Sequence, residues 1–264
     1  MTENYESESS TRFCHVDLYL NDYRISGANG KGVSEIYSLA SGHAELYERF
    51  CNGMMFLANP WWNRSIIEAN NKKNGYYLRK DEKILSYAEL TNNCYRTRHY
   101  LDTSCGADLG LQKAAVDYIT NEQYIGLPMY NFADDSDIMY MDPRLLLRIT
   151  HSIGMAAGNT LDEALNQGIS ELIEKYAQNQ LFQNWDTTLY AINLKNIENP
   201  RLKEIINKIE TLDYQLYLID LSYNYDVPVM MSILIDKKYH ITNINIGSFP
   251  VFDIAAERVL TELY

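Results

Sequence analysis

The sequence lacks the features of several large protein classes. Its 264 residues contain no run of about 18 apolar residues, which excludes a membrane-spanning helix. Lys and Arg number only 23 against 35 Asp and Glu, and this net charge of −12 argues against a protein that coats nucleic acid. The polar N-terminus, MTENYESESS, is neither a secretory signal nor a transit peptide. We therefore expect a cytoplasmic protein without nucleic-acid or membrane partners.

Familiar catalytic and metal-binding motifs are absent as well. The Gly-rich run GANGKG at 27–32 contains Lys31 but not the Walker spacing, so we interpret it as a turn without a ligand. No nucleophile elbow or dinucleotide fingerprint is present, and the five histidines, His43 among them, have no metal-ligand spacing. The cysteines lack C-x-x-C spacing and are predicted to be free thiols in a reducing compartment: Cys14, Cys51, Cys94 and Cys105.

The remaining pattern predicts an α+β fold, because strand-like and helical segments alternate without a strict βαβ rhythm. We expect a loose polar tail over 1–12 and one domain over 1–264. Strands are predicted at 13–26, at 124–132 with a break at Pro128, and at 216–222, 227–236 and 239–247. Helices are predicted at 34–54, 160–184, 200–212 and 253–264. Because the last helix has no C-cap signal, we interpret the chain as the incomplete N-terminal part of a longer protein.

The predicted helix at 34–54 is acidic on one side. At about 100° per residue, Ser41, Glu45 and Glu48 fall within a band roughly 60° wide, and Arg49 borders it. The opposite side is an apolar stripe: Leu39, Leu46 and Phe50.

The predicted helix at 160–184 repeats this arrangement. Glu163 and Glu174 lie within about 20° of one another, Glu171 lies about 60° further round, and Lys175 follows. Asn159 stands at the helix start, where backbone N–H groups favour an anion. Its apolar stripe consists of Leu161, Leu165, Ile169 and Leu172.

Two interpretations of these acidic helices are open. In the structural one, both stripes are solvated faces, and Thr160 with Glu163 forms a capping box. In the functional one, the carboxylates converge and repel one another unless counter-charge is supplied. Mg²⁺ on a triphosphate supplies such charge, with Arg49, Lys175 and Arg258 neutralising phosphate oxygens.

Three segments resemble the YcaO family. They are GKGVSEIYSLASGHAELYERF at 30–50, HSIGMAAGNTLDEALNQGISELIEKYA at 151–177 and GSFPVFDIAAERVLTELY at 247–264, in the family's order. The resemblance implies a YcaO-type α+β fold, with mixed sheets flanked by helices and duplicated acidic helices. It also implies ATP and Mg²⁺ as cofactors without a Walker motif.

By the same resemblance, the expected activity is phosphorylation of a peptide backbone amide oxygen. In cyclodehydratases a Cys, Ser or Thr side chain has attacked that amide, and loss of phosphate leaves an azoline. The nucleophile then belongs to the substrate, and no catalytic nucleophile is assigned to this chain. The expected partners are a ribosomally made precursor peptide and a leader-peptide-binding protein similar to ubiquitin-activating enzymes, with a homodimer as the assembly.

Carried over by motif, the resemblance implies two sets of site residues. The ATP-binding set is Ser41, Arg49, Asn159, Lys175 and Arg258. The Mg²⁺-binding set is Glu45, Glu48, Glu163, Glu171, Glu174 and Glu262. Lys175 departs from the family, which usually has Arg there, so charge is kept but a planar bidentate contact is lost.

Two alternatives to azoline formation stay open. One is thioamide formation on the same activated amide. The other is a docking or scaffold protein of a bacteriocin-type synthetase complex without turnover of its own, which the early end of the chain at Tyr264 would favour.

Overall fold

A computed structural model describes most of the chain, namely residues 2–6, 12–20, 22–51, 81–92, 95–120, 124–130, 138–184, 188–212, 214–223 and 225–263. Its contacts divide the chain into two compact units, Met1–Glu48 with Ile153–Tyr264, and Arg49–Ser152. Helices combine with antiparallel sheets in both, which confirms the α+β class. One domain over the whole chain stays a prediction. Among the described residues, no helix is long and apolar enough to cross a membrane.

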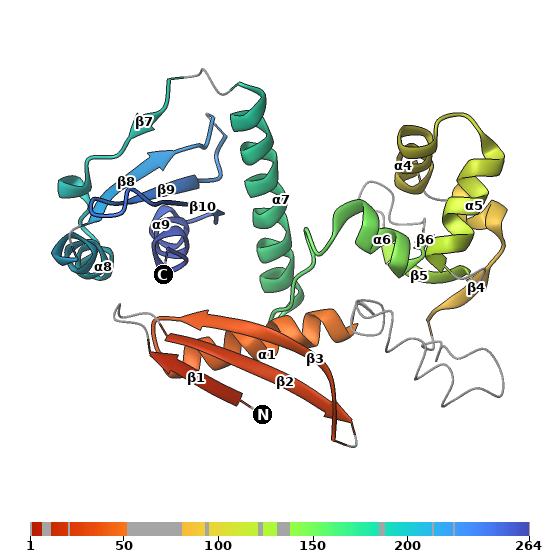
Figure 1. The fold of residues 1–264 in the computed structure, drawn as a ribbon, viewed down its shortest axis with the longest axis horizontal. Helices are drawn as coiled ribbons and strands as arrows, with labels where there is room; N and C mark the ends of the chain where they lie inside the picture. The colour runs from red at the N-terminus through yellow and green to blue at the C-terminus, as the bar shows by residue number, and fades with distance from the viewer. Residues whose placement is uncertain are drawn as a thin grey trace. The chain divides into compact units, whose positions relative to one another are not determined.

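The first unit begins with a three-stranded antiparallel sheet, which α1 covers on one face (Figure 1). Its elements are β1 (Thr2–Glu6), β2 (Arg12–Leu20), β3 (Tyr23–Gly32) and α1 (Glu35–Cys51). The expectation of a loose tail over 1–12 is wrong for Thr2–Glu6, because these residues pair with β2. The helix predicted at 34–54 is confirmed over Glu35–Cys51, and residues 52–54 lie outside the described residues.

The Gly-rich run at 27–32 is the second half of β3, so the predicted turn is wrong. The glycines serve a close approach of helix to strand. A Cβ on Gly30 would lie 1.9 Å from the carbonyl oxygen of Ser38 and 2.5 Å from the amide nitrogen of Gly42, both in α1. Since real Cβ atoms do not come that close to backbone, only glycine permits this packing.

The C-terminal part of the first unit is a four-stranded antiparallel sheet between helices (Figure 1). The strand order is β10-β9-β8-β7, and α8 and α9 pack on one face while α7 packs on the other. The strands are β7 (Tyr190–Ala191), β8 (Tyr214–Asp220), β9 (Val229–Asp236) and β10 (Thr242–Ser248). The helices are α7 (Leu161–Gln183), the 3-10 turn η2 (Leu194–Asn196), α8 (Pro200–Thr211) and α9 (Phe252–Thr261).

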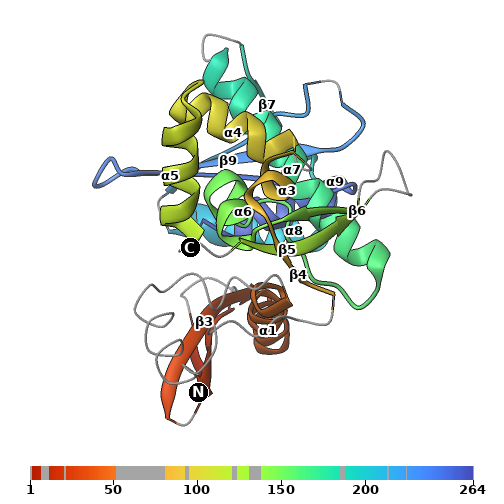
Figure 2. The ribbon, with the colours of Figure 1, turned by 90° about the vertical axis from the view of Figure 1, so that its right-hand side faces the viewer.

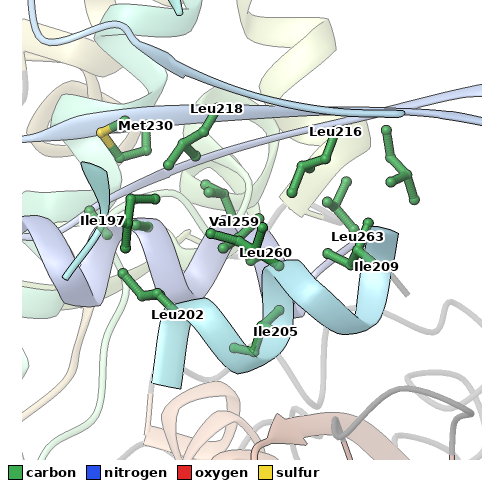
Figure 3. Close-up of a cluster of buried hydrophobic side chains, with 14 residues drawn as sticks. Ile197, Leu202, Ile205, Ile209, Leu216, Leu218, Met230, Val259, Leu260 and Leu263 are labelled. Carbon is green, nitrogen blue, oxygen red and sulfur yellow. The ribbon is translucent and has the colours of Figure 1, made fainter. Parts of the chain in front are cut away.

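The main core lies under α8 and α9. Figure 3 shows apolar side chains of these helices lying against apolar side chains of β8 and β9. The labelled residues are Leu202, Ile205 and Ile209 of α8, Val259 and Leu260 of α9, Leu263 just after α9, Leu216 and Leu218 of β8, and Met230 of β9. Asn199 caps α8 by accepting from the amides of Arg201 and Leu202, and Pro200 stands at the first turn. The three helices predicted at 160–184, 200–212 and 253–264 are thereby confirmed within three residues at each end.

The predicted apolar stripe of α7 is not its buried face. An apolar stripe usually packs inward, yet Leu161, Ile169 and Leu172 are 73%, 52% and 46% exposed. The helix instead buries small residues, and a Cβ on Gly168 would lie 2.7 Å from the carbonyl oxygen of Gly154. The preceding segment, 151–160, thus packs against α7 by backbone.

The described part of the second unit combines helices with a short sheet of order β4-β5-β6, seen in Figure 2. Its elements are β4 (Lys83–Leu85), α3 (Tyr87–Asn92), α4 (Tyr95–Cys105), α5 (Leu109–Thr120), β5 (Tyr124–Tyr130), β6 (Ile138–Met141) and α6 (Pro143–Thr150). Fully buried Asp142 caps α6, accepts from the amide of Ile125 at 2.8 Å and pairs with Arg144 at 2.7 Å.

Pro128 does not break β5, which corrects the prediction. β5 pairs with β4 through residues 124–126 and with β6 through residues 127–130, where Pro128 faces Tyr140. Pro128 therefore has a ladder partner on one side within the described part of the sheet, which is where a strand tolerates proline. Cys14, Cys51 and Cys105 are free thiols, as predicted, and Cys94 lies outside the described residues.

Candidate functional site

Charged side chains from three elements of the first unit meet near the end of β10. We call them the charged cluster: Lys31 of β3, Glu174 and Lys175 of α7, Arg258 of α9 and Glu262 at its end. Lys175 Nζ donates to Glu174 Oε1 at 2.9 Å, and Lys31 Nζ lies 3.8 Å from Glu262 Oε1. The cluster therefore joins all three segments that resemble the YcaO family.

Arg258 ties α9 to α7. Its Nη1 donates to Oε1 of Gln167 at 2.8 Å and to the carbonyl oxygen of Ser248 at 3.4 Å. Gly247 makes this reach possible, because a Cβ there would lie 2.9 Å from Cγ1 of Val259 and would push α9 away from β10. Arg258 is thus held by groups distant in sequence, while its charge still acts on Glu174.

Glu174 is the most buried carboxylate of the cluster, with a side chain 13% exposed. Burial raises the pKa of Glu174 and is the largest influence on it; the negative charge of Glu262 raises it further, whereas Lys175 and Arg258 lower it. Because burial and the charge of Glu262 together outweigh the two cations, additional positive charge beside Glu174 would be favourable. The donor set of carboxylate oxygens with nearby cations fits a hard divalent cation that carries a polyphosphate.

The start of α7 carries three residues of interest, and their contacts are local. Thr160 caps the helix by accepting from the amide of Glu163 at 3.2 Å. Glu163 in turn accepts from the backbone amide of Asn159 at 2.8 Å and from its side chain at 3.1 Å. The structure thus brings Asn159 and Glu163 together, in the capping arrangement that the structural interpretation expects.

Glu171 has a backbone partner. Its Oε2 accepts from the amide of Gly154 at 2.9 Å, which fastens the segment before α7 to the middle of the helix. Gly154 has φ of 81°, a left-handed conformation that favours glycine. Glu171 and Glu174 are both half-buried, whereas Glu163 is exposed.

The predicted residues of α1 are placed on one helix but not in one metal centre. Ser41 is exposed, Glu45 and Glu48 are half-buried, and Arg49 lies where α1 passes into the second unit. Throughout the described ranges, no three Asp, Glu, His or Cys side chains gather closely enough to hold a metal ion. The six predicted metal ligands come from three helices: Glu45 and Glu48 from α1, Glu163, Glu171 and Glu174 from α7, and Glu262 from the end of α9. Of these, Glu174 and Glu262 belong to the charged cluster.

Two members of this neighbourhood were missed by reasoning from the sequence. Gln167 is four residues from both Glu163 and Glu171, so helical spacing could have placed it on their face. Lys31 was assigned to a turn, and only the pairing of β3 with β2 reveals its direction. His43, by contrast, hydrogen-bonds through Nδ1 to the carbonyl oxygen of Leu39 at 2.8 Å, which agrees with a structural role.

A family model matches residues 29–264 and is described as YcaO cyclodehydratase, ATP- and Mg²⁺-binding. The chain belongs to the YcaO family. This confirms the resemblance seen in the sequence and the family's cofactors, ATP and Mg²⁺. The assignment of those cofactors to individual residues of the chain stays a prediction.

Curated relatives and solved structures agree with this membership. The chain is 26% identical over 249 residues to the Escherichia coli protein named ribosomal protein S12 methylthiotransferase accessory factor YcaO. It is also 26% identical over 246 residues to an uncharacterised protein of Haemophilus influenzae. Each match covers 89% of this chain and 40% of the relative, so the chain spans about two-fifths of these relatives.

Two solved structures cover 100% of this chain with a TM-score of 0.62. One is a heterocyclase in complex with substrate and cofactor, at 19% identity and 36% of that chain. The other is YcaO from Methanopyrus kandleri bound with AMPPCP and Mg²⁺, at 12% identity and 60% of that chain. At these identities the likeness shows the fold, which confirms the expected YcaO-type architecture.

Proposed function

We propose that this chain is the nucleotide-binding part of a cyclodehydratase that uses ATP and Mg²⁺ to activate a backbone amide of a ribosomally made precursor peptide. The observation that carries the proposal is the charged cluster, which joins the three family segments around a buried carboxylate. Membership of an ATP- and Mg²⁺-binding family supports it. A leader-peptide-binding partner protein and a homodimer complete the proposed assembly.

The roles of the cluster follow from its chemistry. Glu174 and Glu262 would supply carboxylate oxygens to Mg²⁺, while Lys175 and Arg258 would neutralise phosphate oxygens. ATP supplies a phosphoryl group that turns the amide oxygen into a leaving group. The protein's own task is then positioning and charge neutralisation, as in other phosphoryl transfers. The remaining residues of the family pattern are proposed for the same site on resemblance: Ser41, Glu45, Glu48, Arg49, Asn159, Glu163 and Glu171.

The net reaction consumes a peptide and ATP and yields an azoline peptide, ADP and phosphate. The side chain of a substrate Cys, Ser or Thr forms a bond to the amide carbon, and the amide oxygen departs on phosphate. Product mass separates this reaction from thioamide formation on the same activated amide, because the first removes water and the second exchanges oxygen for sulfur.

The test is phosphate release from ATP by the chain in the presence of Mg²⁺, precursor peptide and the partner protein. Glu174→Ala and Glu171→Ala are expected to abolish peptide-dependent release. Glu204→Ala, on the exposed face of α8, is the matched control and should leave it intact. Undiminished release in both Glu174→Ala and Glu171→Ala would contradict the proposal, and release without an azoline product would redirect it to another amide modification.

A further inference from the structure

Lys31 is the one member of the charged cluster that comes from outside α7 and α9. It is the next-to-last residue of β3 and pairs in register with Phe13. Its neighbours Gly30 and Gly32 pack against backbone of α1 around Ser38, so both point toward the helix. Since side chains alternate along a strand, Lys31 points to the opposite face of the sheet. Its direction is therefore set by the two glycines beside it.

The partner of Lys31 on that face is Glu262, more than 200 residues away in sequence. Lys31 Nζ lies 3.8 Å from Glu262 Oε1, and the side chains are 43% and 38% exposed. An ion pair so accessible to water contributes little to stability. Stability alone is thus a poor reason for a lysine directed at this carboxylate.

Charge balance suggests a better reason. Glu174 and Glu262 are the two carboxylates of the charged cluster, and like charges repel one another, so a cation beside Glu262 offsets that repulsion. The ammonium of Lys31 supplies that cation in the ligand-free protein. A divalent metal at the same carboxylate would take over this task, and its higher charge would displace the ammonium of Lys31 from Glu262. The released ammonium, on a flexible four-carbon stem, would then lie beside the phosphates that accompany the metal.

We propose that Lys31 exchanges partners, from Glu262 in the ligand-free protein to a phosphate oxygen of the Mg²⁺-bound nucleotide. This rests on the proposed function, since it assumes that Glu262 faces the metal. Lys31 is thereby a phosphate-binding residue contributed by β3, in the sheet of order β1-β2-β3, although it belongs to no Walker motif. It links nucleotide binding to the β3 edge of that sheet.

The exchange predicts opposite effects on metal and nucleotide. In Lys31→Met, affinity for ATP with Mg²⁺ should fall roughly tenfold, the loss typical of one charge-assisted hydrogen bond. Affinity for Mn²⁺ alone should be retained or rise, because the lysine no longer competes for Glu262. Lys31→Arg keeps the charge and should recover most of the nucleotide affinity. Lys203→Met, exposed on α8, removes the same charge elsewhere and should change neither affinity.

The measurements are calorimetric titration of ATP with Mg²⁺ and paramagnetic resonance of free Mn²⁺, on the 264-residue chain. Wild-type binding of ATP that Lys31→Met leaves unchanged would overturn the exchange alone. A parallel fall of Mn²⁺ affinity in Lys31→Met would also overturn it, because Lys31 would then only support the fold. Absence of ATP binding by the wild type would overturn the proposed function together with it.

Discussion

The first turn and the middle of α7 carry the same residue type in different surroundings. Glu163, in the first turn, is exposed and is held by Asn159 and Thr160, its neighbours in sequence. Glu174, about three turns further on, is buried and is influenced by Arg258 and Glu262 of α9. One carboxylate thus completes a helix cap, and the other belongs to a long-range charged cluster.

This difference teaches that the family's glutamates need not act equally. An exposed carboxylate is screened by water and interacts weakly with a bound cation. A buried carboxylate in lower dielectric interacts strongly, and its own charge is costly until a cation arrives. The difference in burial therefore ranks Glu174 above Glu163 for metal binding.

The largest expected effect is on nucleotide binding. Glu174→Gln should weaken binding of ATP with Mg²⁺ by at least about tenfold, because it replaces a largely buried carboxylate with a neutral side chain of similar shape. Glu163→Gln should weaken it by no more than about threefold, since the lost charge is exposed. Calorimetric titration compares them directly. Equal losses would show that burial does not rank these ligands.

The next effect is on the stability that the contacts between α9 and α7 give to the fold. Arg258→Met removes the hydrogen bonds that join α9 to Gln167 and Ser248, and should lower the free energy of unfolding by about 1–2 kcal/mol. Arg201→Met is the matched control, because Arg201 forms an exposed ion pair with Glu257 at 3.1 Å. Its cost should stay below about 1 kcal/mol. Urea denaturation measures both, and the comparison fails if the control costs more.

Local signals explain what the sequence predicts well. Thr160 and the Asn199–Pro200 pair mark helix starts by capping chemistry that involves only neighbouring residues. The buried face of α8 follows from its apolar period, Leu202, Ile205, Ile206 and Ile209. Each of the three family segments likewise contains most or all of one helix, namely α1, α7 or α9.

Tertiary contacts explain what the sequence predicts poorly. The run at 27–32 has the composition of a turn, yet Gly30 is required by the backbone of α1. Pro128 is harmless because β4 and β6 pair with different halves of β5. Lys31 and Gln167 enter the site through partners in α9, and no local pattern encodes a partner so far along the chain.

At the start of α7, the contribution of the helix cap to stability can be tested. Thr160→Ala should lower the free energy of unfolding by about 1 kcal/mol, because it leaves the amide of Glu163 without its acceptor. Thr160→Ser keeps the hydroxyl and should recover most of that loss. Nucleotide affinity should be unchanged in both, as titration can check. A large loss of affinity in Thr160→Ala would tie the cap to the binding site.

The smallest effect is the contribution of Glu174 to the pH dependence of the free energy of unfolding. The pKa of Glu174 is raised above its ordinary 4.5, chiefly by burial. The folded protein therefore binds a proton at Glu174 more readily than the unfolded chain, so this group favours folding at low pH and disfavours it as pH rises from 4.5 through the raised pKa. His15, whose pKa is raised chiefly by its hydrogen bond to Asn29, also gives stability that is lost as pH rises.

The difference in unfolding free energy between wild type and Glu174→Gln isolates the contribution of Glu174, because His15 is common to both. As pH increases, the wild type should lose stability relative to Glu174→Gln. The loss should be smaller when Mg²⁺ and ATP are present. A difference that stays constant across the pH range would place Glu174 in water, as Glu163 is, and would remove the contrast between these two glutamates of α7.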